Sequence, residues 1–359
     1  MKILHLQTEL NLTCGITRTI SQIVFYSSAV IEHHLIVLGG NALNRFENNK
    51  SKLKVVPINY HSLSGTLKLI ILLLNYCRNN SIQIVHSHHR YFDVLIWIIN
   101  PFLKVKTITS IQSKLYNNKV FSYKANDLIA CSKAIKDHLI NIFNIDEKRI
   151  KVIYNSFDIR ASEHLEDKVQ LRNELGIGKV DFIVGFVGRI NFAEKGVDLL
   201  LAAFREIFND KMKIHLLIIG DGSNQLEVQE FCELNKSSVS LLSSKENIFD
   251  YYNLMDLVVL PSRIDPFPLV MLETGLMNRP FIGSNVDGIA ELIEHEKDGL
   301  LFESGNVDDL KNQILRIFNN RLLADTLAKN LNKKVLESYT VEKIIPQYEL
   351  LYKNILNRI

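Results

Sequence analysis

The sequence has 359 residues, of which 47% are hydrophobic and 23% charged, values typical of a globular chain long enough for two domains. No apolar run reaches the roughly 18 residues of a membrane span, and the longest, residues 67–77, is predicted to be a buried helix. Polar residues at 9 and 11 come too early for a signal-peptide core, and the four cysteines form no C-x-x-C pair. We therefore expect a cytoplasmic protein with free thiols.

The net charge of +3 hides an asymmetry along the chain. Residues 1–155 contain 19 Lys and Arg against 8 Asp and Glu, whereas the remainder contains 23 against 31. A basic N-terminal half favours an anionic partner, which could be the inner membrane surface or a phosphate-bearing acceptor. Nucleic acid is not expected, because no aromatic-basic motif is present. Attraction between the two halves of the chain is the alternative explanation.

The first half alternates short apolar strands with helices. Helices are predicted near residues 17–30 and 65–78, and a further helix is expected after a capping serine at residue 132. This alternation is typical of a doubly wound parallel sheet. The predicted strands are residues 2–6, 34–40, 54–58, 82–89, 105–111, 127–132 and 149–155.

A charged stretch, residues 156–180, interrupts this rhythm, and the same alternation then starts again. Strands are predicted at 181–188, 213–222, 256–262, 280–284 and 299–302, and helices at 197–208, 225–235, 269–278 and from Gly288. The expected fold is therefore α/β, with two Rossmann-like parallel-sheet domains facing a cleft. We place the domains at 1–160 and 161–340, with a C-terminal helix, 341–359, packing back on the first domain.

Two loops of the second domain carry the residues with the most chemical content. Gly188 ends a strand, and Arg189 and Lys195 lie on the loop that follows. A planar guanidinium and a lysine ammonium suit the two phosphates of a diphosphate. A solvated basic loop is the plainer alternative.

Asp265 and Glu273 lie eight positions apart, on a proline-rich loop and an apolar helix. A carboxylate in apolar surroundings needs a hydrogen-bond donor, and sugar hydroxyls can serve. A charge–dipole contact at a helix N-terminus would explain Glu273 but not Asp265. If both loops lie at the carboxyl edge of one sheet, the two cations and two carboxylates should surround a single pyrophosphate.

Other candidates are weaker in isolation. Gly288 opens a helix whose N–H groups could bind an anion, although an ordinary cap explains it equally well. Gly15 opens a helix in the first domain and could cover donor phosphates, or simply form a turn. His86 and His88, followed by another histidine, end a strand. A metal ion could bind there, but polar lining of a cleft is preferred because no acidic ligand lies near in sequence.

Taken in order, these segments resemble the retaining glycosyltransferases of family four, the "glycosyl transferases group 1" set with the GT-B fold. The resemblance covers most of the chain. CGITR is similar to the family's glycine-rich loop, and VGRINFAEKG to its G-R-x-x-x-x-K-G motif. DPFPLVMLE is similar to its E-x7-E segment, and NDLIACS and KVIYNSFD to two stretches before the second domain.

The resemblance implies a role for each matching position. Arg189 and Lys195 would hold the donor diphosphate and stabilise the charge on the departing nucleotide. Asp265 would lie near the donor sugar's hydroxyls, and Glu273 at the nucleotide ribose. Gly15 and Gly288 would line the donor phosphates. Backbone contacts to the sugar are implied for Phe267, Pro268, Leu269 and Val270.

The resemblance also implies retention of configuration by front-face attack, in which the departing phosphate accepts the acceptor's proton. No cofactor or metal is expected, because the nucleotide-sugar is a substrate and the sequence has no D-x-D. This chain has Asp265 where relatives have Glu, and Gln112 where many have a cleft histidine. Acceptor-side candidates are therefore His86, His88 and Gln112.

The predicted function is transfer of a sugar from a nucleotide-diphosphate donor, UDP in preference to GDP, to a glycan or lipid-linked saccharide. The family implies a role in surface polysaccharide or lipopolysaccharide biosynthesis, at the cytoplasmic face of the membrane. A nucleotide-sugar epimerase of the GT-B fold and a non-catalytic sugar-binding protein are the alternatives. Product analysis without an acceptor would separate the epimerase from a transferase.

Overall fold

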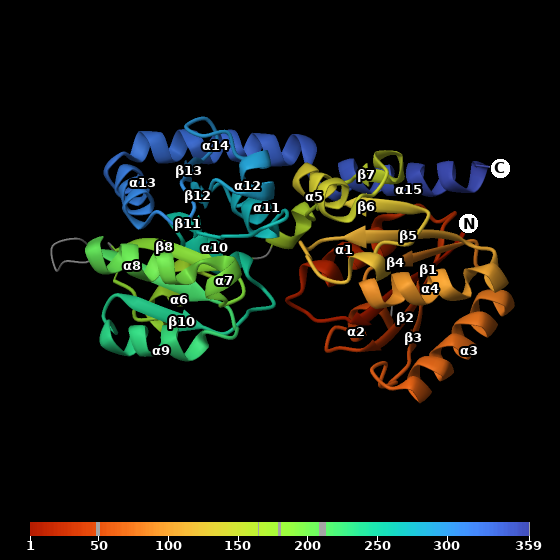
Figure 1. The fold of residues 1–359 in the computed structure, drawn as a ribbon. Coiled ribbons are helices and arrows are strands. Elements are labelled where there is room, and N and C mark those ends of the chain that lie inside the picture. Colours follow the sequence, from red (N-terminus) through yellow and green to blue (C-terminus); the bar gives the residue numbers. More distant parts are fainter. Residues whose placement is uncertain (48–50, 164, 179–180, 208–212, 359) are drawn as a thin grey trace. The chain divides into compact units, whose positions relative to one another are not determined.

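The computed structural model describes residues 1–47, 51–163, 165–178, 181–207 and 213–358. The chain forms two compact units, Met1–Ser156 together with Val341–Ile359, and Phe157–Thr340. We call them the N-terminal and the C-terminal unit (Figure 1). The sequence placed the domain boundary at residue 160, a few positions beyond the end of the first segment.

A seven-stranded parallel sheet forms the centre of the N-terminal unit, in the order β3-β2-β1-β4-β5-β6-β7. Its strands are β1 (Lys2–Glu9), β2 (Glu32–Gly39), β3 (Ser51–Val55), β4 (Ile84–Ser87), β5 (Lys106–Ile111), β6 (Asp127–Ala130) and β7 (Ile150–Val152). The helices of this unit are α1 (Gly15–Tyr26), α2 (Asn44–Glu47), α3 (Leu63–Asn79), α4 (Arg90–Leu103), α5 (Lys133–Phe143) and α15 (Val341–Asn357).

All seven predicted strands of this unit are present, but β3 begins and ends earlier than expected. Residues 51–55 pair with β2, whereas the predicted strand included Pro57. Proline lacks the N–H group that a sheet ladder needs, so pairing stops before it. Helix α4 was not predicted, although its buried residues recur at helical spacing; it contains Pro101, a residue that normally ends a helix.

Helix α15 brings the C-terminal end of the chain back to the first sheet (Figure 1). Its buried face, which includes Ile345, Tyr348 and Tyr352, packs with sheet residues such as Ile3 and Ile84 in one apolar cluster. The Tyr352 hydroxyl is hydrogen-bonded to His86 Nδ1 at 2.8 Å, and both side chains are fully buried. The helix therefore completes the core of the N-terminal unit.

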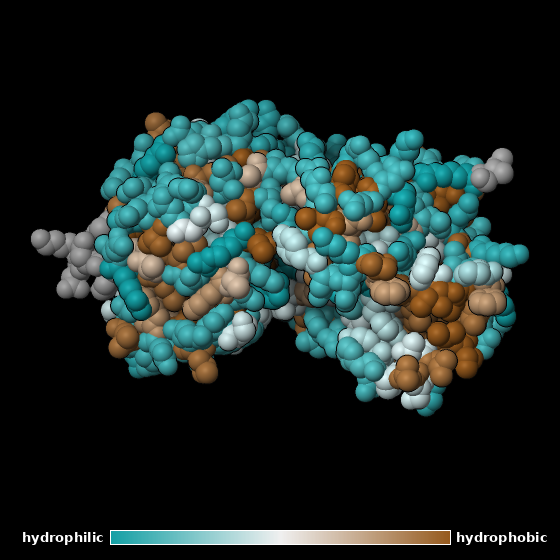
Figure 2. Space-filling view, viewed as in Figure 1, coloured by the Kyte–Doolittle hydropathy of each residue, from teal (hydrophilic) through white to brown (hydrophobic). Residues whose placement is uncertain are grey.

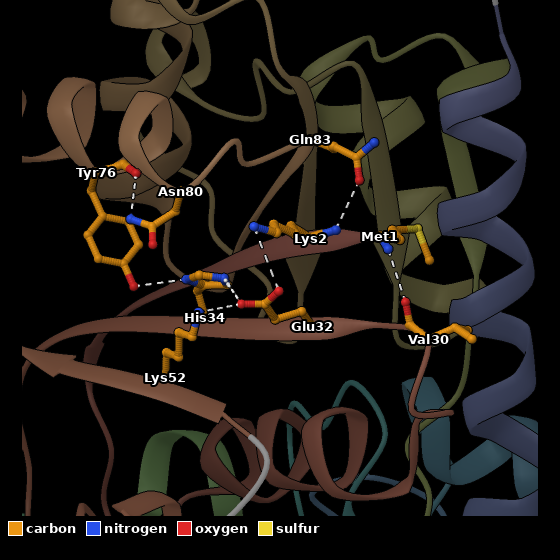
Figure 3. Close-up of polar contacts among 9 residues, drawn as sticks. All are labelled: Met1, Lys2, Val30, Glu32, His34, Lys52, Tyr76, Asn80 and Gln83. Atoms are coloured by element: carbon orange, nitrogen blue, oxygen red, sulfur yellow. Dashed lines mark hydrogen bonds and ion pairs between the residues drawn. The ribbon is translucent and has the colours of Figure 1, made fainter.

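Polar contacts tie the strands together at their amino-terminal ends (Figure 3). Glu32, at the start of β2, accepts from Lys52 on β3 at 2.6 Å and from the buried imidazole of His34 at 3.1 Å. His34 also contacts the Tyr76 hydroxyl of α3 at 2.9 Å. Because the strands are parallel, this cluster lies at the edge opposite to the one at which such sheets bind ligands, so we assign it to structure.

The C-terminal unit has a six-stranded parallel sheet in the order β10-β9-β8-β11-β12-β13. The strands are β8 (Phe182–Val187), β9 (Ile214–Ile219), β10 (Val239–Leu242), β11 (Leu257–Leu260), β12 (Phe281–Ser284) and β13 (Leu300–Phe302). The helices are α6 (Lys168–Glu174), α7 (Phe192–Lys195), α8 (Val197–Ile207), α9 (Gln225–Leu234), α10 (Phe249–Leu254), α11 (Leu269–Leu276), α12 (Asp287–Leu292), α13 (Val307–Asn319) and α14 (Arg321–Ser338).

The strand order of this sheet reverses between β8 and β11, which are neighbours in space but far apart in sequence. Such a reversal leaves a crevice beyond the carboxyl ends of the two strands, and ligands of open α/β sheets bind there. The loops that follow β8 and β11 are the two loops that the sequence singled out. Strand β10 and the short helices α7 and α10 were not predicted. Across the described ranges, none of the helices combines the length and hydropathy that crossing a bilayer requires.

Replacing Tyr352 by phenylalanine tests the docking of α15. The Tyr352→Phe variant leaves the buried His86 Nδ1 without this partner, and we expect the free energy of unfolding to fall by about 1–3 kcal/mol. Urea denaturation measures the change. The control is Tyr116→Phe, at a mostly exposed ring, where we expect less than about 0.5 kcal/mol. Equal effects at both positions would contradict the proposed role of the hydroxyl.

Candidate functional site

A buried ion pair joins the two loops. Lys195 Nζ lies 2.5 Å from Asp265 Oδ2, and only 16% and 4% of the two side chains are exposed. The Ser262 hydroxyl donates to the same oxygen at 3.0 Å. Breaking one partner of such a pair leaves an uncompensated charge in a low-dielectric site, which is strongly unfavourable. The predicted meeting of a cation from the first loop with a carboxylate from the second is therefore present in the structure.

Gly196 allows Lys195 to approach the second loop. It ends the short helix α7 with φ of +63°, the left-handed region that glycine adopts most readily. A Cβ atom at this position would lie 2.0 Å from the carbonyl oxygen of Pro261, the residue that follows β11. A side chain at position 196 would force the loops apart and separate Lys195 from Asp265.

Contacts that the sequence did not reveal fix the second loop against α7. The Glu194 carbonyl accepts the N–H groups of Arg263 and Ile264, at 2.7 and 3.1 Å. The Arg263 guanidinium forms a two-pronged ion pair with Asp198 on α8, at 2.7 and 2.8 Å. Arg263 and Asp198 lie 65 positions apart, and no local pattern links them. Together these bonds give the Lys195–Asp265 pair a fixed frame.

Gly288 has a different role from the one predicted. Its N–H donates to the Asp265 carbonyl at 3.1 Å, so this group is already used within the protein. A Cβ atom there would lie 2.1 Å from the Pro266 carbonyl oxygen. The Asp287 carboxylate in turn accepts from the Asp265 N–H at 3.1 Å. Gly288 therefore holds the loop in place by close packing, which corrects the expectation that its N–H binds an anion.

Glu273 lies on α11 and is 4% exposed. Its Oε2 accepts a hydrogen bond of 2.8 Å from the Tyr252 hydroxyl on α10, which is fully buried. This hydrogen bond explains how a carboxylate can be buried in an otherwise apolar helix, because buried polar groups need a hydrogen-bond partner. The sequence predicted a hydroxyl donor but assigned it to a ligand, and the structure shows that a tyrosine of the protein supplies one.

Arg189 is the most exposed of the predicted site residues, with 68% of its side chain accessible, and it pairs with Glu194 at 2.6 Å. The expectation that Arg189, Lys195, Asp265 and Glu273 all meet one another is therefore too simple, because the four charges occupy three separate contacts.

The segment between Asp265 and α11 is largely enclosed. Phe267 and Pro268 are buried, and Leu269 and Val270 are half-buried. Pro268 is the N-cap of α11, whose first-turn N–H groups have no acceptor within the helix.

In the N-terminal unit, the strand order reverses between β1 and β4. Gly15 begins α1 after β1 and is half-buried, and its carbonyl accepts from Thr19 at 3.1 Å. Gln112 follows β5 directly and is also half-buried. Both residues therefore lie at the carboxyl edge of this sheet, the edge at which open α/β sheets bind ligands.

His86 and His88 do not line a surface, which corrects the expectation from the sequence. His86 is fully buried, and its two nitrogens contact Tyr352 and Ser110 at 2.8 and 2.7 Å. His88 is 4% exposed and its Nε2 is 3.0 Å from His5 Nδ1. His5 Nε2 continues this row to His33 Nδ1 at 2.9 Å. The histidines form a hydrogen-bonded row inside the core, because β1, β2 and β4 are adjacent.

The spacing of His5, His86 and His88 would also be compatible with a metal ion, since their nitrogens lie within 4.8 Å of one another. His86, however, directs both nitrogens to Ser110 and Tyr352. Burial lowers the pKa of His88 to about 3 and that of His33 to about 4, the latter with a smaller contribution from His34. Within the described part of the chain, His33 Nε2 and His88 Nδ1 have no hydrogen-bond partner. We therefore interpret the row as uncharged histidines that pack in the core, not as a metal site.

Two family models match separate parts of the chain. The model described as "Glycosyltransferase Family 4" matches residues 15–161. The model described as "Glycosyl transferases group 1" matches residues 181–320, which include both loops of the candidate site.

Relatives with curated names are similar over most of the chain. An uncharacterized glycosyltransferase of Methanocaldococcus jannaschii is 29% identical over 65% of this chain, and the match spans 61% of that protein. The capsular polysaccharide biosynthesis glycosyltransferase CapM of Staphylococcus aureus is 22% identical over 99% of this chain and 97% of its own. The UDP-Gal:alpha-D-GlcNAc-diphosphoundecaprenol alpha-1,3-galactosyltransferase of Escherichia coli is 24% identical over 81% of this chain and 80% of its own.

Solved structures share the fold across the whole chain. Alr3699/HepE of Anabaena, solved in complex with UDP, has a TM-score of 0.85 at 20% identity. The match covers 99% of this chain and 100% of the Anabaena chain. The same protein has been solved in complex with UDP-glucose, with a TM-score of 0.85 at 19% identity and the same coverage.

Because several histidines are buried, we expect the protein to lose stability in mild acid. Their folded-state pKa values are lowered, so the unfolded chain binds protons first as the pH falls below about 6.5. Their contribution is complete above that pH and is lost towards pH 4 and 3, at up to about 1.4 kcal/mol per pH unit for each histidine.

Urea unfolding between pH 7.5 and 5.5 measures this slope. We expect His88→Gln to flatten it relative to the parent protein, whatever its effect on absolute stability. His61→Asn, at an exposed position, should leave the slope unchanged. Identical slopes in His88→Gln and the parent would contradict the account.

Proposed function

Because this chain belongs to the group 1 glycosyltransferases, which include family four, we propose that it transfers a sugar from a UDP-sugar to a glycan or lipid-linked saccharide. The observation that carries this proposal is the Lys195–Asp265 pair at the strand-order reversal of the C-terminal unit. This position suits a nucleotide donor, because it combines fixed charge with the edge of the sheet that binds ligands.

The donor diphosphate binds at the loop after β8. Lys195 leaves Asp265 and contacts phosphate oxygens, and Arg189 exchanges Glu194 for the same group. Each cation already contacts a carboxylate of the protein, so the diphosphate replaces one anionic partner by another, and sugar hydroxyls then satisfy the buried Asp265 carboxylate. Binding of UDP by a protein of the same fold and the UDP-sugar in the name of the Escherichia coli relative favour UDP over GDP.

The two carboxylates bind opposite ends of the donor. Asp265, once released by Lys195, accepts hydrogen bonds from sugar hydroxyls, while Ser262 continues to orient it. Glu273 accepts from the ribose hydroxyls, and the Tyr252 hydrogen bond holds its carboxylate in position. Backbone N–H groups at the start of α11 complete the contacts to the donor.

The cations assist the chemical step by stabilising charge that develops on the departing diphosphate. We propose retention of configuration, with front-face attack by the acceptor hydroxyl. The bond from the sugar's anomeric carbon to the phosphate oxygen breaks, the bond to the acceptor oxygen forms, and the departing phosphate takes the acceptor's proton. No separate protein base is then required.

We place the reaction in surface polysaccharide or lipopolysaccharide assembly, at the cytoplasmic face of a membrane. The capsular and diphosphoundecaprenol-linked activities in the names of the relatives support this setting. The excess of cations in residues 1–155 favours an anionic or phosphate-bearing acceptor. Gly15 and Gln112, at the carboxyl edge of the first sheet, are the positions through which the N-terminal unit would contact the substrates.

Substitution of the two cations tests the donor site. We expect Lys195→Met and Arg189→Ala each to raise the dissociation constant of UDP about 10- to 100-fold, because each removes a charge-assisted contact to phosphate. Calorimetric titration with UDP measures the change, and thermal unfolding checks the fold. Lys236→Ala, at an exposed ion pair on the same unit, is the control. Unchanged UDP affinity in both variants would refute the site.

Chelation tests the proposal that the enzyme needs no metal. The sequence has no D-x-D, and Lys195 and Arg189 supply the positive charge that a metal would otherwise provide. We expect UDP affinity to be unchanged after dialysis against EDTA, and elemental analysis of the purified protein to find no stoichiometric metal. A loss of affinity that Mg²⁺ or Mn²⁺ restores would contradict this prediction.

A further inference from the structure

Helices α3 and α4 of the N-terminal unit expose large hydrophobic side chains. On α3, Leu63, Leu67 and Ile71 recur every four residues, so they form one stripe, and between 59% and 88% of each is exposed. On α4, Trp97, Ile98 and Phe102 are exposed as well. The two helices contact each other, and Figure 2 shows hydrophobic residues gathered over them, at the lower right.

The core does not account for this stripe, because α3 already buries its opposite face. Leu69, Leu73 and Cys77 on that face pack into an apolar cluster under the sheet. A helix at the surface of a soluble protein normally carries charged or polar residues on its outer side. Contiguous exposed apolar surface of this kind marks an interaction site.

The loop between β5 and β6 extends the patch. Tyr116, Val120 and Phe121 are each more than half exposed. Two contacts hold this loop against α4. Arg90, at the start of α4, donates to Asn117 at 2.8 Å, and the Lys124 ammonium lies 5.4 Å from the centre of the Trp97 ring. We define the apolar patch as Leu63, Leu67, Ile71, Trp97, Ile98, Phe102, Tyr116, Val120 and Phe121.

The charged residues in the segment of the chain that carries the patch are almost all basic. Residues 63–124 contain eight Lys and Arg and a single acidic residue, Asp93. Asp93 is 2% exposed, and its carboxylate accepts from Thr109 and from the N–H groups of Lys124 and Ala125. It therefore offers little negative charge to the surface. The basic residues are Lys68, Arg78, Arg90, Lys104, Lys106, Lys114, Lys119 and Lys124.

We propose that the apolar patch and its basic rim dock the N-terminal unit on an anionic lipid bilayer. Apolar side chains enter the boundary between headgroups and acyl chains, while Lys and Arg contact anionic headgroups. Tryptophan is enriched at this boundary in membrane proteins, and Trp97 is one of the exposed residues of the patch. A second copy of the chain fits less well, because two basic rims would face each other.

Docking gives the membrane setting of the proposed function a physical basis. It would hold the enzyme where a lipid-linked acceptor lies and would raise the local concentration of that substrate. The inference extends the proposed function but uses none of the donor-site residues. Failure of docking would therefore leave UDP binding intact, and failure of the donor site would leave docking intact.

Vesicle sedimentation tests the docking surface. Vesicles of phosphatidylcholine with 30% phosphatidylglycerol are compared with vesicles of phosphatidylcholine alone, at two salt concentrations. We expect the parent protein to bind the anionic vesicles, and less strongly at high salt. The triple variant Leu67→Ser/Ile71→Ser/Phe102→Ser and the double variant Lys68→Glu/Lys104→Glu should each reduce binding at least tenfold.

The control is Leu226→Ser/Leu322→Ser, which replaces two leucines of the C-terminal unit that are at least as exposed as the three residues changed in the patch. It should bind vesicles as the parent does, and all variants should keep the parent's affinity for UDP. Absence of binding by the parent, or equal binding by the patch variants and the control, would overturn the proposal. A dimer of the parent in light scattering that the triple variant disrupts would overturn it too, because the patch would then join two copies.

Discussion

The ion pair between Lys195 and Asp265 is the contact on which the candidate site depends. It joins loops 70 positions apart in sequence, and it does so where the order of the strands reverses. The close approach at Gly196 and the Arg263–Asp198 pair bring the loops together. Because Lys195 and Asp265 are then largely buried, removing either charge would leave the other without its partner. Each cation of the site is thus held in place by a carboxylate, Lys195 by Asp265 and Arg189 by Glu194, and an anionic ligand could replace that carboxylate.

The sequence was sufficient to predict the class of fold. The fold class, two parallel-sheet α/β domains of the GT-B type, is confirmed, as is the resemblance to the group 1 glycosyltransferases. Buried parallel strands read as apolar runs, and glycines and prolines mark their ends, so most strands were found. Strand β10 was not predicted because it has only four residues, most of them half-buried. Helix α7 was not predicted because a single helical turn has no detectable period.

The partners of the charged residues could not be predicted in the same way. Nothing near Glu273 in the sequence points to Tyr252, and nothing near Arg263 points to Asp198. His86 and His88 looked like polar residues at a strand end, yet neighbouring strands and α15 enclose them. Local pattern predicts which face of a strand is buried, whereas contacts between distant segments depend on the assembled fold. Gly288 illustrates the same limit, because its neighbour in space is the Asp265 carbonyl.

A crystal structure of the protein with UDP bound is the most direct test of the central claim. The account predicts that Lys195 Nζ moves from Asp265 to a diphosphate oxygen, at about 2.7–2.9 Å, and that a ribose hydroxyl donates to Glu273. A diphosphate bound elsewhere on the C-terminal unit, with the Lys195–Asp265 pair unbroken, would contradict it.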